Sequence, residues 1–171
     1  MDGHTEKAEG GSIVARPAEG GRFATRIELP GGAILADEPE GVGGGGAGPT
    51  PYQLLSAALA ACTSMTIGLY ARRSGLALPG LRVEVEHGLV AGTPPTDRFT
   101  RRILTDAPLA PTDEAKLIEI AGKCPVHRTL SGGGAEIVTS AAAIPPPAAP
   151  LKPADPPEAH LEQMEKACAA G

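Results

Sequence analysis

Short runs in which hydrophobic and polar positions alternate lie near the start of the chain and predict β-strands. Three such runs occupy residues 12–18, 22–29 and 33–37. Within the second run, Phe23, Thr25 and Ile27 alternate with polar or small neighbours. Turns that contain glycine or proline, at 19–21 and 30–32, separate the runs, a pattern typical of an antiparallel meander.

A long segment without charged side chains follows and predicts a helix over residues 50–74. Thr50 and Pro51 suit the N-cap and the first helical position. Between Leu54 and Tyr70 no side chain is charged. Because a helix that is apolar nearly all round must be covered on more than one side, we expect this helix to be buried.

The remaining segments predict further strands and a second helix. Strands are expected at 81–90, 98–107 and 135–143, and a helix over 111–122. In the first of these strands, Leu81, Val83 and Val85 face one way and their charged neighbours face the other. This alternation indicates an antiparallel strand with one exposed face.

Both ends of the chain differ in composition from its middle. Residues 1–11 lack apolar periodicity and are expected to be a disordered N-terminus. Residues 144–171 form a proline-rich tail, in which we expect one short helix carrying Cys168. Residues 12–143 are therefore expected to form a single domain.

A glycine-rich stretch over residues 38–48 contains the pattern Gly41-x-Gly43-x-x-Gly46. It lacks the preceding buried strand and the later acidic residue of a dinucleotide site. The acidic residues just before the glycines would also repel a pyrophosphate. We therefore expect a flexible connector here.

Composition restricts the classes of function. Of the 171 residues, 42% are hydrophobic but only 2% are aromatic, so the core must consist of small aliphatic side chains, which favours an oligomer. The net charge of −5 argues against a nucleic-acid partner. Because there is no run of 18 apolar residues and the N-terminus is acidic, we expect no membrane helix, no signal peptide and a cytoplasmic location.

Three cysteines, Cys62, Cys124 and Cys168, carry the candidate chemistry. In the cytosol structural disulfides are rare, so the three indicate free thiols, redox chemistry or a metal. Cys124 precedes Pro125, a step that suits a helix N-terminus, where exposed amides favour a thiolate. Cys62 lies within the apolar helix, where burial raises its pKa and makes it a small inert hydrophobic residue, unless tertiary contacts bring an arginine to it.

A metal site is a rival interpretation of the same residues. Cys124-x-x-His127 is half of a ligand set, which Cys62, His87 or Cys168 would complete. A zinc site usually shows two ligand pairs in the sequence, and only one is present. We therefore expect neither a metal nor another cofactor.

Three segments occur in the order GPTPYQLLSAALAACTSMTIGLYARRSG, LRVEVEH and KCPVHRTL. Together they resemble the OsmC/Ohr family of thiol-dependent proteins, and most of all its branch with a Cys-Pro-Val-His-Arg-Thr-Leu motif. The resemblance spans residues 12–143. It implies an α+β fold with antiparallel sheets and a long buried central helix, in an intertwined homodimer with active sites at its interface.

The resemblance also implies a chemistry, the reduction of organic hydroperoxides. Cys62 would be the peroxidatic thiol that becomes a sulfenic acid, and Cys124 the resolving thiol that closes a disulfide with it. A dithiol or a lipoylated protein would then reduce the pair again. Such a disulfide requires the two Cα atoms to lie within about 7 Å of each other.

The family activates its peroxidatic cysteine with an arginine from the N-terminal strands, held by a glutamate near the start of the central helix. Arg22 and Arg26 are both candidates for this arginine, with Arg22 slightly preferred. The carboxylate position falls at Tyr52 or Gln53, neither of which is acidic. Gln53 either orients the arginine through hydrogen bonds or serves only as a capping-box residue.

Without this carboxylate the arginine would be held less firmly, which leaves the efficiency of a peroxidase open. Glu38 or Glu40 would be an alternative source of the carboxylate. The second function that we consider is therefore an OsmC-like protein that binds a small hydrophobic ligand or senses redox state, with weak or no peroxidase turnover. Leu55, Leu59 and Tyr70 would line its small apolar pocket between protomers.

Overall fold

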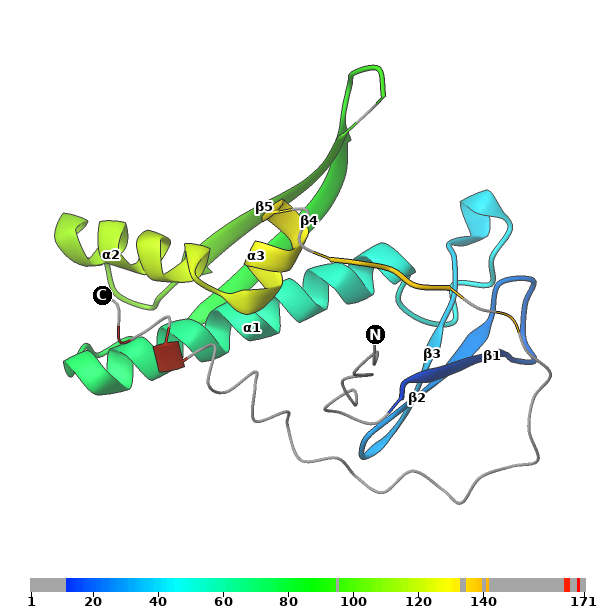
Figure 1. Cartoon of the computed structure of the whole chain (residues 1–171), viewed down its shortest axis with the longest axis horizontal. Helices are drawn as coiled ribbons and strands as arrows, with labels where there is room; N and C mark the ends of the chain where they lie inside the picture. Colours follow the sequence, from blue (N-terminus) through cyan, green and yellow to red (C-terminus); the bar gives the residue numbers. More distant parts are fainter. Residues whose placement is uncertain are drawn as a thin grey trace, which may run out of the picture. The chain divides into compact units, whose positions relative to one another are not determined.

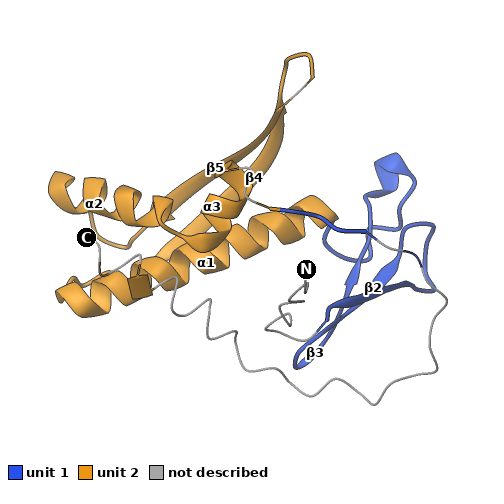
Figure 2. Ribbon diagram, in the orientation of Figure 1, with its two compact units in different colours: residues 1–50, 136–161 blue, residues 51–135, 162–171 orange. Residues whose placement is uncertain are grey.

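The computed structural model describes residues 12–94, 96–132, 135–139, 141, 165, 166 and 169 (Figure 1). The chain divides into two compact units, one of residues 1–50 and 136–161 and the other of residues 51–135 and 162–171 (Figure 2). The expected disorder of residues 1–11 and the position of Cys168 lie outside the described residues, and the predicted single domain stays a prediction.

The first unit contains the predicted antiparallel meander. Its strands are β1 (Val14–Pro17), β2 (Thr25–Leu29) and β3 (Gly32–Ala36), hydrogen-bonded in the order β1-β2-β3. In this register Ile27 lies opposite Ala15 on one side and Ile34 on the other. The turn between β2 and β3 contains Gly31 with a φ of 88°, a left-handed conformation that glycine adopts without steric cost.

The glycine-rich stretch after β3 is a folded loop, and not the flexible connector that the sequence predicted. The carboxylate of the buried Asp37 accepts backbone N–H bonds from Glu38 at 2.8 Å, Gly45 at 2.9 Å and Ala47 at 3.2 Å. These bonds, first that from Ala47, lower the pKa of Asp37. The loop also forms a short 3₁₀ helix, η1 (Glu40–Val42).

The second unit is built on one long helix, α1 (Pro51–Ser74). It continues with the antiparallel hairpin of β4 (Arg82–Val90) and β5 (Thr96–Leu104), then α2 (Pro111–Gly122) and α3 (Pro125–Gly132). Helix α1 packs against β4, α2 and α3, with α2 beside its C-terminal half and α3 beside its middle (Figure 1). The α+β arrangement of antiparallel sheets with a long central helix is therefore as predicted.

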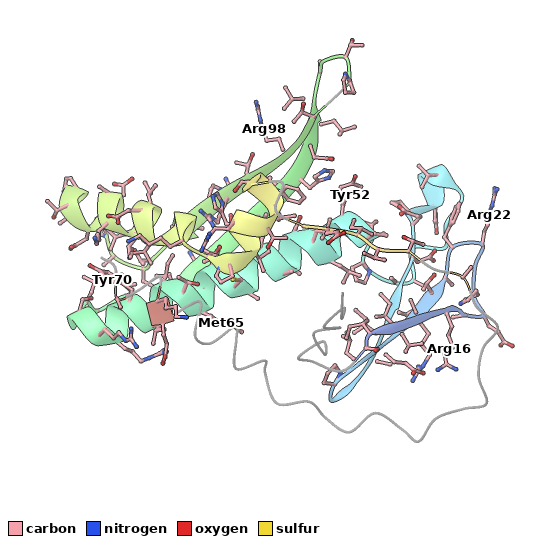
Figure 3. All side chains as sticks on the ribbon, in the orientation of Figure 1. Arg16, Arg22, Tyr52, Met65, Tyr70 and Arg98 are labelled. Carbon is pink, nitrogen blue, oxygen red and sulfur yellow. The ribbon has the colours of Figure 1, made fainter. Side chains whose placement is uncertain are left out.

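Helix α1 buries one face within its unit. The buried residues recur every three or four positions: Ser56, Leu59, Cys62, Thr63, Thr66, Ile67 and Ala71. Ile67 packs with the buried Leu117, Ile120 and Ala121 of α2. On the other side of the helix Leu55 is 42% exposed and Met65, labelled in Figure 3, is 57% exposed, so the second side for which the sequence predicted cover is open within this unit.

Among the described residues, α1 is long and apolar enough to cross a membrane by length and composition alone. Its mean hydropathy reaches 1.6 over 18 residues. The same composition is typical of the central helix of a packed core. Thr63, Thr66 and Ile67 are completely buried against the rest of the unit, which supports that interpretation.

The strand predicted at 135–143 does not form over the part of it that the structure describes. Residues 135–139 and 141 have no regular secondary structure. Ile137 is 88% exposed and Val138 83% exposed, so their apolar side chains contact little of the chain. A strand is stable only when it is paired in a sheet, so a run with strand-like composition does not become one without a partner.

Candidate active site

Two cysteines that lie far apart in the sequence meet inside the second unit. Cys62 comes from the middle of α1, and Cys124 lies directly before the first residue of α3. Their Sγ atoms are 2.6 Å apart, and both residues are free, buried cysteines. The predicted encounter of these two side chains is therefore confirmed. Their apolar surroundings are Leu59, Val85, Phe99 and Val126.

The start of α3 explains how Cys124 is held. Pro125 begins the helix, as the sequence predicted, and the carbonyl oxygen of Cys124 accepts the N–H of Arg128 at 3.1 Å. This bond places Cys124 at the N-cap position. The free amides of the first turn therefore face its sulfur, where the helix dipole also favours a negative charge.

The contact between the sulfurs shifts the pKa values of the two thiols in opposite directions. The pKa of Cys124 is lowered to about 6, mainly by its hydrogen bond with Cys62. Burial acts in the opposite direction, while the amides of His127 and Val126 and the hydroxyl of Thr63 lower the pKa further. The pKa of Cys62 is raised, first by the hydrogen bond with Cys124 and then by burial. Near neutral pH the pair therefore holds one proton and one negative charge, and the thiolate character lies mainly on Cys124.

An arginine that sequence analysis missed lies in the same cluster. Arg101 of β5 donates from Nη1 to the hydroxyl of Thr63 at 2.8 Å and to the carbonyl oxygen of Ala121 at 3.0 Å. Burial lowers the pKa of Arg101, and attraction to Cys124 and Cys62 raises it. The alternation of β5 contained the signal, because Arg101 occupies the inward position between Phe99 and Ile103, where an apolar residue is expected.

A pocket of about 250 Å³ adjoins the thiol pair. Its lining combines apolar and polar side chains: Leu59, Asp97, Phe99, Arg101, His127, Leu130 and Ser131. Leu59 and Phe99 also belong to the cluster around the two sulfurs, so the pocket reaches that cluster. Leu59 is the one residue that this pocket shares with the pocket predicted between protomers, which stays a prediction; Tyr70 packs against the core between α1 and α2.

The two arginines proposed from the sequence belong to the first unit. Arg22 precedes β2, and its guanidinium carbon lies 5.2 Å from the centre of the Phe23 ring. Arg26 lies on β2 opposite Arg16 and Leu35. Their role at the thiols stays a prediction.

The proposed carboxylate positions lie in the first turn of α1. Gln53 is exposed, and its role stays a prediction. Tyr52, labelled in Figure 3, stacks on the ring of His87 with their centres 4.1 Å apart. The imidazole of His87 in turn pairs with Asp97 at 2.8 Å, so the acidic side chain at this end of the pocket comes from β5.

Among the described residues the rival metal site gains no third ligand. Within the described ranges no group of three or more histidine, cysteine, aspartate or glutamate side chains is placed to hold a metal ion. Cys124 and Cys62 contact each other, while His87 is engaged by Asp97. Cys168 lies outside the described residues.

Comparison with solved structures confirms the fold. The chain is similar to an osmotic stress induced and detoxification response protein from Psychrobacter arcticus, with a TM-score of 0.59 and 23% identity over 71% of this chain and 90% of that one. It is also similar to the organic hydroperoxide resistance protein OsmC from Legionella pneumophila, with a TM-score of 0.53 and 24% identity over 71% and 90% of the two chains. A third similar structure is the organic hydroperoxide resistance protein OhrB of Bacillus subtilis, with a TM-score of 0.55 and 22% identity over 71% of this chain and 90% of that one.

Comparison at the level of sequence gives the family. No protein with a curated description matches the chain. A family profile described as OsmC-like protein matches residues 43–140, which is more than half of the chain and includes both thiols of the pair. The resemblance noted in the sequence is therefore confirmed, and the chain belongs to the OsmC-like protein family.

Proposed function

We propose that this protein reduces organic hydroperoxides to alcohols with the thiols of Cys62 and Cys124. The observation that carries the proposal is the 2.6 Å contact between two buried free sulfurs that come from separate elements. At this distance a disulfide can close with little movement of the backbone. The names of relatives such as the organic hydroperoxide resistance proteins of Legionella pneumophila and Bacillus subtilis support the choice of substrate.

The proposed reaction has two chemical steps. The thiolate of Cys62 attacks the terminal oxygen of the hydroperoxide, so that an S–O bond forms and the O–O bond breaks. The alkoxide takes the proton of the pair and leaves as the alcohol. The thiolate of Cys124 then attacks the sulfur of the Cys62 sulfenic acid, forming an S–S bond, and the hydroxide that leaves takes a proton from solvent to become water. A dithiol, or the dithiol of a lipoylated protein, reduces the disulfide.

The order of attack is compatible with the lower pKa of Cys124. The two sulfurs are in contact and share one proton. Cys62 therefore becomes the thiolate when this proton moves from its sulfur to the adjacent sulfur of Cys124. A sulfur of low pKa is also the better leaving group when the disulfide is reopened, which suits the resolving cysteine.

The pocket beside the thiols favours a substrate with an apolar body. Leu59, Phe99 and Leu130 offer apolar surface, while Arg101 and His127 offer donors to the peroxide oxygens. Burial of an apolar group contributes about 25 cal/mol for each Å² removed from water. Hydrogen peroxide has no such group, so we expect an alkyl or aryl hydroperoxide to react faster.

We further propose that the working form is a homodimer. Between residues 54 and 70 the exposed side of α1 carries apolar or small residues, among them Leu55, Ala58, Ala61 and Met65, and no charge. Such a face needs cover that the unit around α1 does not supply. Sedimentation equilibrium is expected to give the mass of two chains, and a single-chain mass at micromolar concentration would contradict this.

Rapid mixing of the reduced full-length chain with cumene hydroperoxide tests the proposed function. We expect one equivalent of hydroperoxide to be consumed per chain, with loss of two thiols and an intact mass lower by two hydrogen atoms. Hydrogen peroxide at the same concentration should react at least about tenfold more slowly, given the apolar contacts it lacks. Thiols that remain unchanged after mixing would contradict the proposal.

A second candidate function follows from the non-acidic residues at positions 52 and 53. Without a carboxylate to hold an N-terminal arginine, the pocket would bind a small hydrophobic molecule, or the thiols would report redox state, without rapid turnover. The same mixing experiment separates the two functions. Slow formation of the disulfide with no sustained consumption in the presence of a dithiol would favour this second candidate.

A further inference from the structure

Arg101 is a half-buried cation whose hydrogen-bond acceptors carry no charge. Its contacts are the hydroxyl of Thr63 and the carbonyl oxygen of Ala121, near the C-terminal end of α2. Among the described residues no carboxylate lies within ion-pair distance of its guanidinium. A cation removed from water without a counter-charge is costly, so an anion close by is expected.

The thiol pair is the anion that the structure places within reach of Arg101. The hydroxyl of Thr63, next to Cys62 on α1, accepts from Arg101, and its interaction with the Cys124 thiol helps to lower the pKa of that thiol. This hydroxyl, which is completely buried, therefore links the guanidinium to the sulfur. Arg101 is attracted first to Cys124 and then to Cys62.

We propose that Arg101 is the positioning residue that keeps the Cys62–Cys124 pair ionised, through Thr63 and through its charge. The inference rests on the proposed function and deepens it, because an ionised thiol is what a peroxide requires. It differs from the expectation that an arginine of the N-terminal strands supplies this charge. Here the cation comes from β5, in the same unit as both sulfurs.

The other groups around the pair define what the test must separate. His127 of α3 and Asp97 of β5 both line the pocket, and Asp97 is paired with His87 of β4. Lys123, which directly follows α2, is paired with Glu119 of that helix at 2.9 Å. Helix α1 contributes no charged side chain between residues 54 and 71. Arg101 is therefore the permanently charged cation lining the pocket among the described residues.

The test is a pH titration of thiolate absorbance in the reduced full-length chain, with Cys168→Ser as the common background. The unaltered pair is expected to ionise with a midpoint about pH 6. Arg101→Gln should raise this midpoint by about one pH unit, which is about tenfold less thiolate below the midpoint. Arg101→Lys keeps the charge and should recover at least about half of the shift.

Arg102→Gln is the matched control, because the neighbouring side chain faces outward. Arg102 pairs with Glu84 at 2.9 Å and Glu86 at 2.7 Å on the exposed face of the hairpin, so its removal should leave the midpoint unchanged. If Arg101→Gln does not fold, Arg101→Lys and Thr63→Val take its place in the titration. Thr63→Val removes the hydroxyl that accepts from Arg101, and it should also raise the midpoint of thiol ionisation.

Two results would overturn the inference. One is an Arg101→Gln chain that is folded and has the midpoint of the parent chain. The other, should that variant not fold, is an unchanged midpoint in Thr63→Val. Because the titration uses no hydroperoxide, a raised midpoint together with a failed peroxide assay would remove the proposed function and leave the role of Arg101 intact.

Discussion

Replacement of Cys62 by serine is expected to abolish hydroperoxide consumption, with a fall in rate of at least about 10³-fold. A serine hydroxyl is not ionised at neutral pH and does not attack the O–O bond, and Cys124 alone has no partner with which to close a disulfide within the chain. Consumption of cumene hydroperoxide in the presence of a dithiol measures the effect. The control is Cys168→Ser, which we expect to change little because a proline-rich stretch separates this cysteine from the domain.

The fold of the Cys62 variant must be checked, because Cys62 is buried among apolar neighbours. Cys62→Ala avoids a buried hydroxyl and should behave in the same way in the peroxide assay. Full turnover in either folded variant would show that Cys62 is not the attacking thiol. The lower pKa of Cys124 would then identify Cys124 as the thiolate that attacks.

Local sequence signals predicted the helix start at the thiols and the first sheet, while the pairing of Cys62 with Cys124 came from the family resemblance. The Cys124-Pro125 step predicted a helix start, and α3 begins at Pro125. Glycine and proline turns separated three alternating runs, and β1, β2 and β3 form the predicted meander. In each case the signal is local, because a cap or a tight turn depends on a few adjacent residues.

Arg101 was not predicted because its meaning depends on contacts between distant segments. Three arginines occur close together on β5, at positions 98, 101 and 102, and composition alone does not separate them. What distinguishes Arg101 is its inward register, opposite Val85, beside a helix that supplies Thr63. The alternation gives the direction of the side chain, but only the packing of α1 on the hairpin gives its partner.

The glycine-rich loop was predicted wrongly for a related reason. Its order comes from the carboxylate of Asp37, which binds amides eight and ten residues away at Gly45 and Ala47. Asp37 stands at the end of a predicted strand, where an exposed acid is ordinary. Nothing in the spacing of the glycines shows that their amides converge on it, so the sequence pattern resembles that of an unstructured linker.

Replacement of Cys124 by serine is expected to leave one rapid reaction and to stop turnover. Cys62 should still accept one oxygen atom per chain, and intact mass should show a gain of one oxygen instead of the loss of two hydrogens. Without a second sulfur in contact, no disulfide forms within the chain, and steady consumption with a dithiol should fall at least about tenfold.

The pH dependence of that single reaction gives an independent check. In the unaltered pair the pKa of Cys124 is lowered to about 6, so the rate should level off above that pH. In Cys124→Ser the hydrogen bond that most raises the pKa of Cys62 is removed, but burial remains. The pKa of Cys62 should therefore fall towards the usual thiol value of about 8.5 while staying above it, and the rate should keep rising beyond pH ~8. Sustained turnover by this variant would show that an external thiol reduces the sulfenic acid directly, and that the contact between the two sulfurs is not needed for catalysis.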